Sequence, residues 1–230
     1  MNMNNNELFI EKYKELEYLV SIKYNIPKNG SEISFLEKRI EFSNYRKELE
    51  YCREVRNFLQ HECKIDQEFA VIASNEMINL IDKIIELVKN PITAIKICKK
   101  IDQIYYKGLN DYVVSSMLAM NHKKYTHIPI IENKKIVGVF SKTSIFNLLM
   151  EEDVCSLNSS VRFKDIINYI KLNTEKYLFC KSDMNIKEME EIVINEFRNG
   201  SKVSMIFVTS NGNEMGDFIG LFTPFDIMGI

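Results

Sequence analysis

Three residues in the first part of the chain have types that could support catalysis: Arg56, Asn57 and His61, within the sequence REVRNFLQHE. A histidine titrates near neutral pH and can move protons, whereas an arginine keeps its charge and can stabilise a phosphate as negative charge develops. This pair suits acid–base cleavage of a phosphodiester, for example cleavage of RNA by its own 2′-hydroxyl. His61 is also the only histidine in residues 1–90.

Helical spacing restricts how these side chains could act together. Arg53, Asn57 and His61 lie at i, i+4 and i+8 and form one polar stripe, while Arg56 and Gln60 form the adjoining stripe. Arg56 and His61 are five positions apart, which is about 140° around a helix of 3.6 residues per turn. One copy brings them together poorly, and a two-fold dimer could supply complementary groups from both chains.

A second set of chemically useful residues belongs to a sequence that occurs twice. Residues 126–149 read THIPIIENKKIVGVFSKTSIFNLL, and residues 204–230 read SMIFVTSNGNEMGDFIGLFTPFDIMGI. Both copies predict a strand, a polar turn, a second strand and the start of a helix. At a separation of 82 positions they share small or polar residues, namely Gly138, Ser141 and Ser144 in the first copy and Gly220, Thr223 and Asp226 in the second.

The doubled motif resembles a tandem pair of CBS domains, small β-α-β-β-α modules that pair into one unit and often bind adenine nucleotides between them. The signature is Gly, two apolar residues, Ser or Thr, two variable residues and Asp. It is present as GLFTPFD at residues 220–226 and, with a changed last residue, as GVFSKTS at residues 138–144. The resemblance covers residues 91–230 and implies AMP, ADP, ATP or a dinucleotide as a regulatory ligand.

The resemblance assigns nucleotide contacts to six residues: Thr126, Ser141, Ser204, Met205, Thr223 and Asp226. The Asp226 carboxylate can accept two hydrogen bonds from ribose hydroxyls, and Thr223 together with helix-start amides can donate to a phosphate. Ser204 and Met205 would line the base or ribose from the preceding strand. Ser144 replaces the aspartate in the first copy, so we expect that cleft to bind weakly, differently or not at all.

The sequence around Arg56 resembles the motif of HEPN domains, helical bundles whose active members are metal-independent endoribonucleases and pair so that two motifs line one cleft. The resemblance implies Arg56, Asn57 and His61 as catalytic residues, RNA as a substrate and a homodimer. Residues 1–90 contain 13 Lys and Arg against 16 Asp and Glu, so no broad basic field is present to hold RNA. An arginine and a histidine on an exposed helix are also compatible with simple solvation.

The elements that must position these residues change character near Asn90-Pro91. The only proline and the only glycine in residues 1–90 are Pro27 and Gly30, and the apolar residues of this part have helical spacing throughout. This spacing predicts three or four amphipathic helices in an antiparallel bundle. The last helix has its apolar stripe between Met77 and Val88, with Asp66 placed to cap its start.

Residues 91–230 predict alternating strands and helices in the same order twice, which gives an α+β fold for the whole chain. The first CBS-like module, residues 91–152, has a predicted strand at 95–98, a helix at 109–120 and hairpin strands at 128–131 and 136–140. The second module, residues 153–230, has a joining helix at 163–170, a strand at 177–181, a helix at 186–198 and hairpin strands at 203–209 and 217–222.

Composition excludes several other classes of protein. The formal charge of −2 gives no global attraction to nucleic acid or membrane. The opening MNMNNNELF does not resemble a secretion signal, and no apolar run approaches the roughly 18–20 residues of a membrane span. The five cysteines are scattered without a Cys-x-x-Cys pair, so we expect no metal site and a reduced, cytoplasmic protein.

Two functions remain open at this point. In the first, the CBS-like pair binds an adenine nucleotide and controls an attached HEPN-like dimer, with or without RNA cleavage. In the second, the protein is a non-catalytic dimeric sensor or scaffold whose helices only mediate association. The two differ in whether Arg56 and His61 of two chains face one accessible groove.

Overall fold

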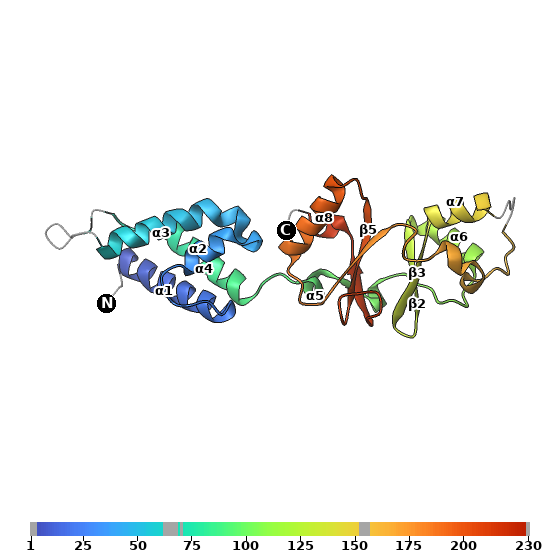
Figure 1. Cartoon of the computed structure of the whole chain (residues 1–230), viewed down its shortest axis with the longest axis horizontal. Helices are drawn as coiled ribbons and strands as arrows, with labels where there is room; N and C mark the ends of the chain where they lie inside the picture. The colour runs from blue at the N-terminus through green and yellow to red at the C-terminus, as the bar shows by residue number, and fades with distance from the viewer. Residues whose placement is uncertain (1–3, 62–68, 70, 152–156, 229–230) are drawn as a thin grey trace. The chain divides into compact units, whose positions relative to one another are not determined.

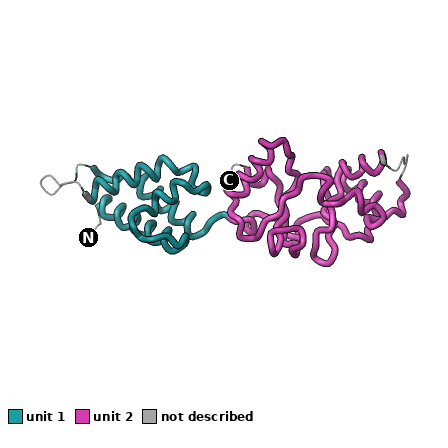
Figure 2. The backbone as a smooth tube through the Cα atoms, viewed as in Figure 1, with its two compact units in different colours: residues 1–92 teal, residues 93–230 magenta. Residues whose placement is uncertain are grey.

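The computed structural model describes residues 4–61, 69, 71–151 and 157–228, without the side chains of His61 and Glu151. The chain divides into two compact units, residues 1–92 and 93–230 (Figure 2). All described strands belong to the second unit, so the chain combines a helical unit with a mixed one. Among the described residues, no helix has both the length and the apolar sequence needed to cross a membrane.

The first unit is built from helices that share one hydrophobic core (Figure 1). Phe9, Leu36, Leu49 and Ile81 come from four different helices and are fully buried in this core. The elements are α1 (Asn5–Lys23), α2 (Glu32–Lys38), the 3₁₀ helix η1 (Ile40–Tyr45), α3 (Arg46–His61) and α4 (Asn75–Lys89).

Polar contacts show that α1 and α4 run in the same direction. At the start of α1, the Asn6 side chain donates to the Val71 carbonyl at 2.9 Å and accepts from the Ala73 N–H at 2.7 Å, just before α4. At the end of α1, Lys23 donates to the carbonyl of Val88 near the end of α4. Alternate helices of an antiparallel bundle run in the same direction, so the orientation of this pair is compatible with the predicted bundle.

The residue that caps the start of α4 differs from the predicted one. Ser74 is the N-cap, and its hydroxyl accepts a hydrogen bond from the Met77 N–H at 3.3 Å. Serine at this position satisfies an amide that has no partner within the helix. Asp66, the predicted cap, lies outside the described residues.

The second unit contains two sheets with helices against them (Figure 1). Strands β2 and β3 form an antiparallel hairpin, and the other sheet has the order β1-β6-β5-β4, in which β4 and β5 are parallel. Both predicted hairpins and the predicted helix at 186–198 are confirmed. The elements are α5 (Ala94–Ile97), β1 (Lys99–Lys100), η2 (Ile101–Gln103), α6 (Val113–Lys123), β2 (His127–Glu132), β3 (Lys135–Ser141), α7 (Lys142–Glu151), η3 (Phe163–Tyr169), β4 (Lys176–Cys180), α8 (Ile186–Arg198), β5 (Val203–Thr209), β6 (Phe218–Phe222) and η4 (Pro224–Asp226).

The predicted strand at residues 95–98 is wrong. This segment is mostly the short helix α5, followed by the two-residue strand β1, and β1 pairs with β6 of the second sheet. The Ala94 N–H donates to the Met184 carbonyl at 2.9 Å, which binds the segment to the later half of the chain. The first half of the unit therefore has no such strand beside β2 among the described residues. Instead, Lys107 forms a single parallel bridge with Ile130 of β2.

The two halves of the second unit exchange segments. Phe163 and Ile166 of η3 pack in the core formed by α6, β2 and β3, whereas Ala94 of α5 packs with α8, β5 and β6. A third cluster, which includes Val139 and Phe207, joins the two sheets. The predicted modules, residues 91–152 and 153–230, therefore each contain a segment that packs on the other.

The glycine that opens each repeated signature lies where an exchanged segment approaches the strand. A Cβ atom at Gly138 would lie 2.4 Å from the Ile170 carbonyl oxygen, and one at Gly220 would lie 2.7 Å from the Lys99 carbonyl oxygen. Either distance is far below van der Waals contact. The repeated glycine therefore permits close packing between backbones at both positions.

Candidate functional site

A pocket of about 810 Å³ in the second unit is formed by both copies of the repeated signature. The first copy contributes residues 141–143, where β3 leads into α7, and the second contributes residues 223–225, where β6 leads into η4. The remaining walls come from the start of β2, the residues at the start of β4 and β5, and the end of α8.

The pocket brings together five of the six residues predicted to contact a nucleotide: Thr126, Ser141, Ser204, Met205 and Thr223. Each of them comes from the beginning or the end of a strand, so their proximity depends on how the two sheets pack. Asp226, the sixth, is not among the lining residues.

Asp226 is engaged with its own turn. One carboxylate oxygen accepts from the N–H of Thr223 at 2.7 Å and from its hydroxyl at 2.8 Å, and the other lies 3.7 Å from Lys99 Nζ. Burial raises the pKa of Asp226, but the hydrogen bonds from Thr223 and the charge of Lys99 outweigh it and lower the pKa. In this structure the carboxylate caps the start of η4.

Ser144 performs the corresponding function in the first copy. It is fully buried, and its hydroxyl oxygen accepts from the Ser141 N–H while the Ser144 N–H donates to the Ser141 hydroxyl, both at 3.2 Å. The Ser144 hydroxyl also approaches the Val139 carbonyl at 3.3 Å. The replacement of aspartate by serine therefore preserves the cap at the start of α7.

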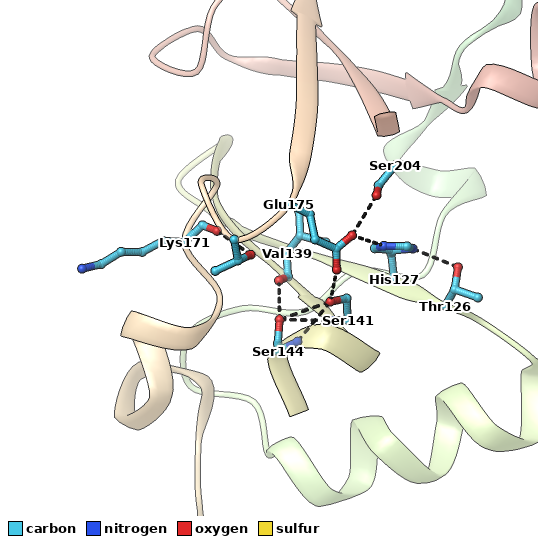
Figure 3. A network of polar contacts seen from close by, with 9 residues as sticks. Thr126, His127, Val139, Ser141, Ser144, Lys171, Glu175 and Ser204 are labelled. Atoms are coloured by element: carbon cyan, nitrogen blue, oxygen red, sulfur yellow. Dashed lines mark hydrogen bonds and ion pairs between the residues drawn. The ribbon is translucent and has the colours of Figure 1, made fainter. Parts of the chain in front are cut away.

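Glu175 lines the pocket and is the centre of a hydrogen-bond network (Figure 3). One carboxylate oxygen accepts from the Ser141 hydroxyl at 2.5 Å, and the other accepts from the Ser204 hydroxyl and lies close to His127 Nε2, both at 2.8 Å. His127 Nδ1 lies 2.9 Å from the Thr126 hydroxyl. The network therefore connects three of the predicted residues through an acid that the sequence did not single out.

These contacts keep Glu175 ionised. Burial of the side chain raises its pKa, but hydrogen bonds from Ser141, His127 and Ser204 outweigh that effect and lower the pKa to about 2. Only 14% of the side chain is exposed. The pocket therefore contains a fixed negative charge at any pH near neutrality.

Local structure explains the position of Glu175. The N–H and the hydroxyl of Thr174 both donate to the Lys171 carbonyl, at 3.1 and 2.9 Å, and this closes a turn directly before β4. Glu175 is the last residue before that strand. In the sequence, Glu175 stands out only by lying close to the strand predicted at 177–181. That position did not distinguish it among the 32 acidic residues.

The rest of the pocket has a cationic rim and an apolar wall. Lys142, Lys176 and Lys202 are exposed at the pocket, and Lys176 pairs with Glu196 at 2.9 Å. The apolar wall is made by Phe197, Val203, Met205, Pro224, Phe225 and Met228. This combination can accommodate a ligand with an anionic group and a flat apolar group.

No metal site was found in the part of the chain that the structure describes. No group of three or more histidine, cysteine, aspartate or glutamate side chains there could hold a metal ion. Cys52, Cys98 and Cys180 are free and buried. The other two cysteines, Cys63 and Cys155, lie outside the described residues.

The predicted catalytic residues occupy the first unit. Arg56 Nη2 lies 3.4 Å from Glu17 Oε1, Arg56 Nη1 donates to the Asn57 side chain at 3.1 Å, and the guanidinium lies 5.6 Å from the centre of the Tyr13 ring. Asn57 is exposed, and the His61 side chain lies outside the described residues. The side chains of Arg56 and Asn57 therefore contact each other, but the Arg56 guanidinium is also paired with Glu17 of the same chain.

Comparison with known proteins identifies part of the second unit. The family model described as "CBS domain" matches residues 112–151, from the residue before α6 to the end of α7. No curated protein matches the chain.

Several solved structures are similar to this chain over about three fifths of its length. CBSX2 in complex with AMP is 16% identical, with 59% of this chain and 92% of that chain covered and a TM-score of 0.43. The CBS domains of a transcriptional regulator from Streptococcus pneumoniae are 16% identical, covering 60% and 98%, with a TM-score of 0.41. The CBS domain pair of protein MJ0100, in complex with 5-methylthioadenosine and S-adenosyl-L-methionine, is 16% identical, covering 60% and 93%, with a TM-score of 0.40. The sequence match to the family model identifies a CBS domain within residues 112–151 of this chain.

Proposed function

We propose that the second unit binds an adenine nucleotide in the pocket between the two copies of the signature and acts as a regulatory sensor. The observation that carries this proposal is that five residues predicted independently of the structure line one pocket. The CBS domain match at residues 112–151 includes the parts of the pocket formed by the first copy. The three free cysteines fit a reducing compartment, and we propose the cytoplasm.

The chemistry of the pocket suits the parts of a nucleotide. A volume of about 810 Å³ falls in the range of about 300–1,000 Å³ common for small-molecule sites. The apolar wall, with Phe225 89% exposed, can cover the face of a base. The ammonium groups of Lys142 and Lys202 can neutralise a phosphate, since both lysines are exposed at the pocket.

We propose that the first unit mediates association of two copies and responds to the nucleotide. A nucleotide can alter that association only through a difference between its affinities for the two association states. This gives a non-catalytic dimeric sensor as the simplest function.

Ribonuclease activity is the second candidate, and it would belong to the first unit. The adjacency of Arg56 and Asn57 on α3 favours it, whereas the pairing of Arg56 with Glu17 opposes it, because that ion pair must open before the guanidinium can bind RNA. Cleavage of labelled single-stranded RNA in EDTA, compared between wild type and His61→Ala, decides this point. Equal or absent cleavage leaves the sensor without catalysis.

Calorimetric titration of the full chain with AMP, ADP, ATP and an adenine dinucleotide tests nucleotide binding. We expect at least one ligand to bind, and the Lys142→Glu/Lys202→Glu double variant to bind it at least about tenfold more weakly, because charge-assisted hydrogen bonds contribute about 1.5–3 kcal/mol. Lys164→Glu, an exposed lysine of η3 outside the pocket, is the matched control and should bind normally. Absence of binding of all four ligands at millimolar concentration would refute the proposal.

A further inference from the structure

The Glu175 carboxylate retains capacity for another hydrogen-bond donor. An ionised carboxylate offers about four acceptor positions on its two oxygens. Three positions are used by Ser141, Ser204 and His127, as Figure 3 shows. Because Glu175 lines the pocket, a ligand that enters can supply the remaining donor.

The partners of Glu175 are adjacent in sequence to other residues that line the pocket. Ser204 stands between Val203 and Met205 of the apolar wall, and Ser141 directly precedes Lys142 of the cationic rim. Both serine hydroxyls converge on the same carboxylate. The carboxylate therefore shares the pocket with an apolar surface and with positive charges.

A nucleotide has one part suited to each of these features. The base is flat and apolar on its faces, the sugar carries hydroxyl donors, and the phosphate is anionic. With the base on the wall and the phosphate at Lys142, the sugar lies at Glu175. A pose with the phosphate against the Glu175 carboxylate is disfavoured by the repulsion between the two negative charges.

We propose that Glu175 is the ribose acceptor of this pocket: its carboxylate accepts a hydrogen bond from one ribose hydroxyl, while the Ser204 hydroxyl oxygen accepts one from the neighbouring hydroxyl. This inference rests on the proposed nucleotide binding and adds its selectivity. Glu175 thereby selects ribonucleotides over deoxyribonucleotides. It also orients the bound nucleotide, because its negative charge keeps the phosphate away from the carboxylate.

The two residues at the signature positions do not provide this group. One carboxylate oxygen of Asp226 accepts hydrogen bonds from Thr223, and the other lies close to Lys99. Asp226 is also not among the residues that line the pocket. Ser144 is fully buried in the cap of α7 and has no carboxylate. Among the residues that line the pocket, Glu175 is the acidic one.

The test compares AMP with 2′-deoxyAMP and 3′-deoxyAMP by calorimetric titration of the full chain. In the wild type, removal of the hydroxyl bound by Glu175 should weaken binding roughly 10- to 100-fold, as expected for a hydrogen bond to a charged group. In Glu175→Gln, which preserves the size of the side chain and removes its charge, the ratio between AMP and that analogue should fall below about threefold. Glu190→Gln on α8, outside the pocket, should keep the wild-type ratio.

The ratio of affinities separates recognition from a structural effect. If Glu175→Gln loses affinity equally for AMP and for both deoxy analogues, Glu175 only supports the fold and the inference is wrong. Equal binding of all three ligands by the wild type would also overturn it, while nucleotide binding itself would stand. If another of the four nucleotides binds in place of AMP, the same comparison is made with its 2′-deoxy and 3′-deoxy forms. Absence of binding of all four by the wild type would refute both the inference and the proposed function.

Discussion

Glu175 shows how a single acidic residue can be both a structural contact and a ligand group. Its three hydrogen-bond partners belong to β2, β3 and β5, so its charge joins strands from both halves of the second unit. Since those hydrogen bonds favour the ionised form, the pKa is lowered to about 2 from 4.5. The fold is therefore stabilised by the charge that we propose for ribose binding.

This linkage predicts how stability depends on pH. A group whose pKa is lowered on folding stabilises the protein above its unfolded pKa, and that contribution disappears as the pH falls toward the folded pKa. For Glu175 the window is from about 4.5 down to about 2. Relative to wild type, Glu175→Gln should be less stable at pH 7, and this deficit should be smaller by roughly 2 kcal/mol at pH 3, since each pKa unit corresponds to about 1.4 kcal/mol.

Urea unfolding followed by circular dichroism measures that deficit. The control is Glu190→Gln, whose carboxylate pairs with Lys187 on the same helix. Its difference from wild type should change by less than about 1 kcal/mol between pH 7 and pH 3, because an ion pair three positions apart on one helix contributes only about 0.2–0.5 kcal/mol. A deficit of Glu175→Gln that is constant over this range would contradict the assignment of a low pKa.

At the residue scale, the sequence identified groups that belong to a repeated motif and missed those that do not. Thr223 and Ser141 occur at matching positions of two copies, and both line the pocket. Glu175 belongs to no motif, and its function depends on Ser204, which is 29 positions away, and on His127, which is 48 positions away. Only the packing of the two sheets brings these groups together.

At the scale of elements, the exchanged segments depend on the two signature glycines. The Ile170 carbonyl accepts a hydrogen bond from the Val139 N–H at 2.8 Å, beside Gly138. A larger residue at position 138 would displace that carbonyl and the end of η3 with it. The glycine thus determines how closely the segment at 163–170 packs on β3.

We expect Gly138→Ala to destabilise the second unit by about 1–3 kcal/mol, because the added methyl group would lie 2.4 Å from a backbone oxygen. Gly108→Ala is the matched control, since its nearest neighbour would be a side-chain oxygen of Glu132 at 3.4 Å, and we expect a change below about 1 kcal/mol. Thermal unfolding of both variants measures the difference. Equal midpoints for Gly138→Ala and wild type would show that η3 moves away without cost.

The success of prediction at this scale depended on whether each element has a local cause. The β2–β3 hairpin is closed by Asn133 and Lys134, both with positive φ, so its strands find each other through a two-residue turn. The strand β1 pairs with β6 more than a hundred positions away, and nothing near Lys99 indicates that partner.

At the scale of the whole molecule, the proposed function requires communication between a nucleotide site in the second unit and association through the first. Linkage makes this requirement quantitative. If the nucleotide changes the dimer dissociation constant by a factor, then dimerisation must change the affinity for the nucleotide correspondingly. Two independent measurements must therefore agree.

Sedimentation equilibrium of the full chain with and without AMP provides the first measurement, and titration with AMP at protein concentrations below and above the dimer constant provides the second. We expect a dimer of twice 27.0 kDa and a change of about 5- to 150-fold in its dissociation constant on saturation with AMP, the usual range of coupling between sites. The Lys142→Glu/Lys202→Glu variant should dimerise as the unliganded wild type does, whether or not AMP is added. A dimer constant that AMP does not change would mean that nucleotide binding and association are independent functions, because a ligand with equal affinity for both states shifts neither.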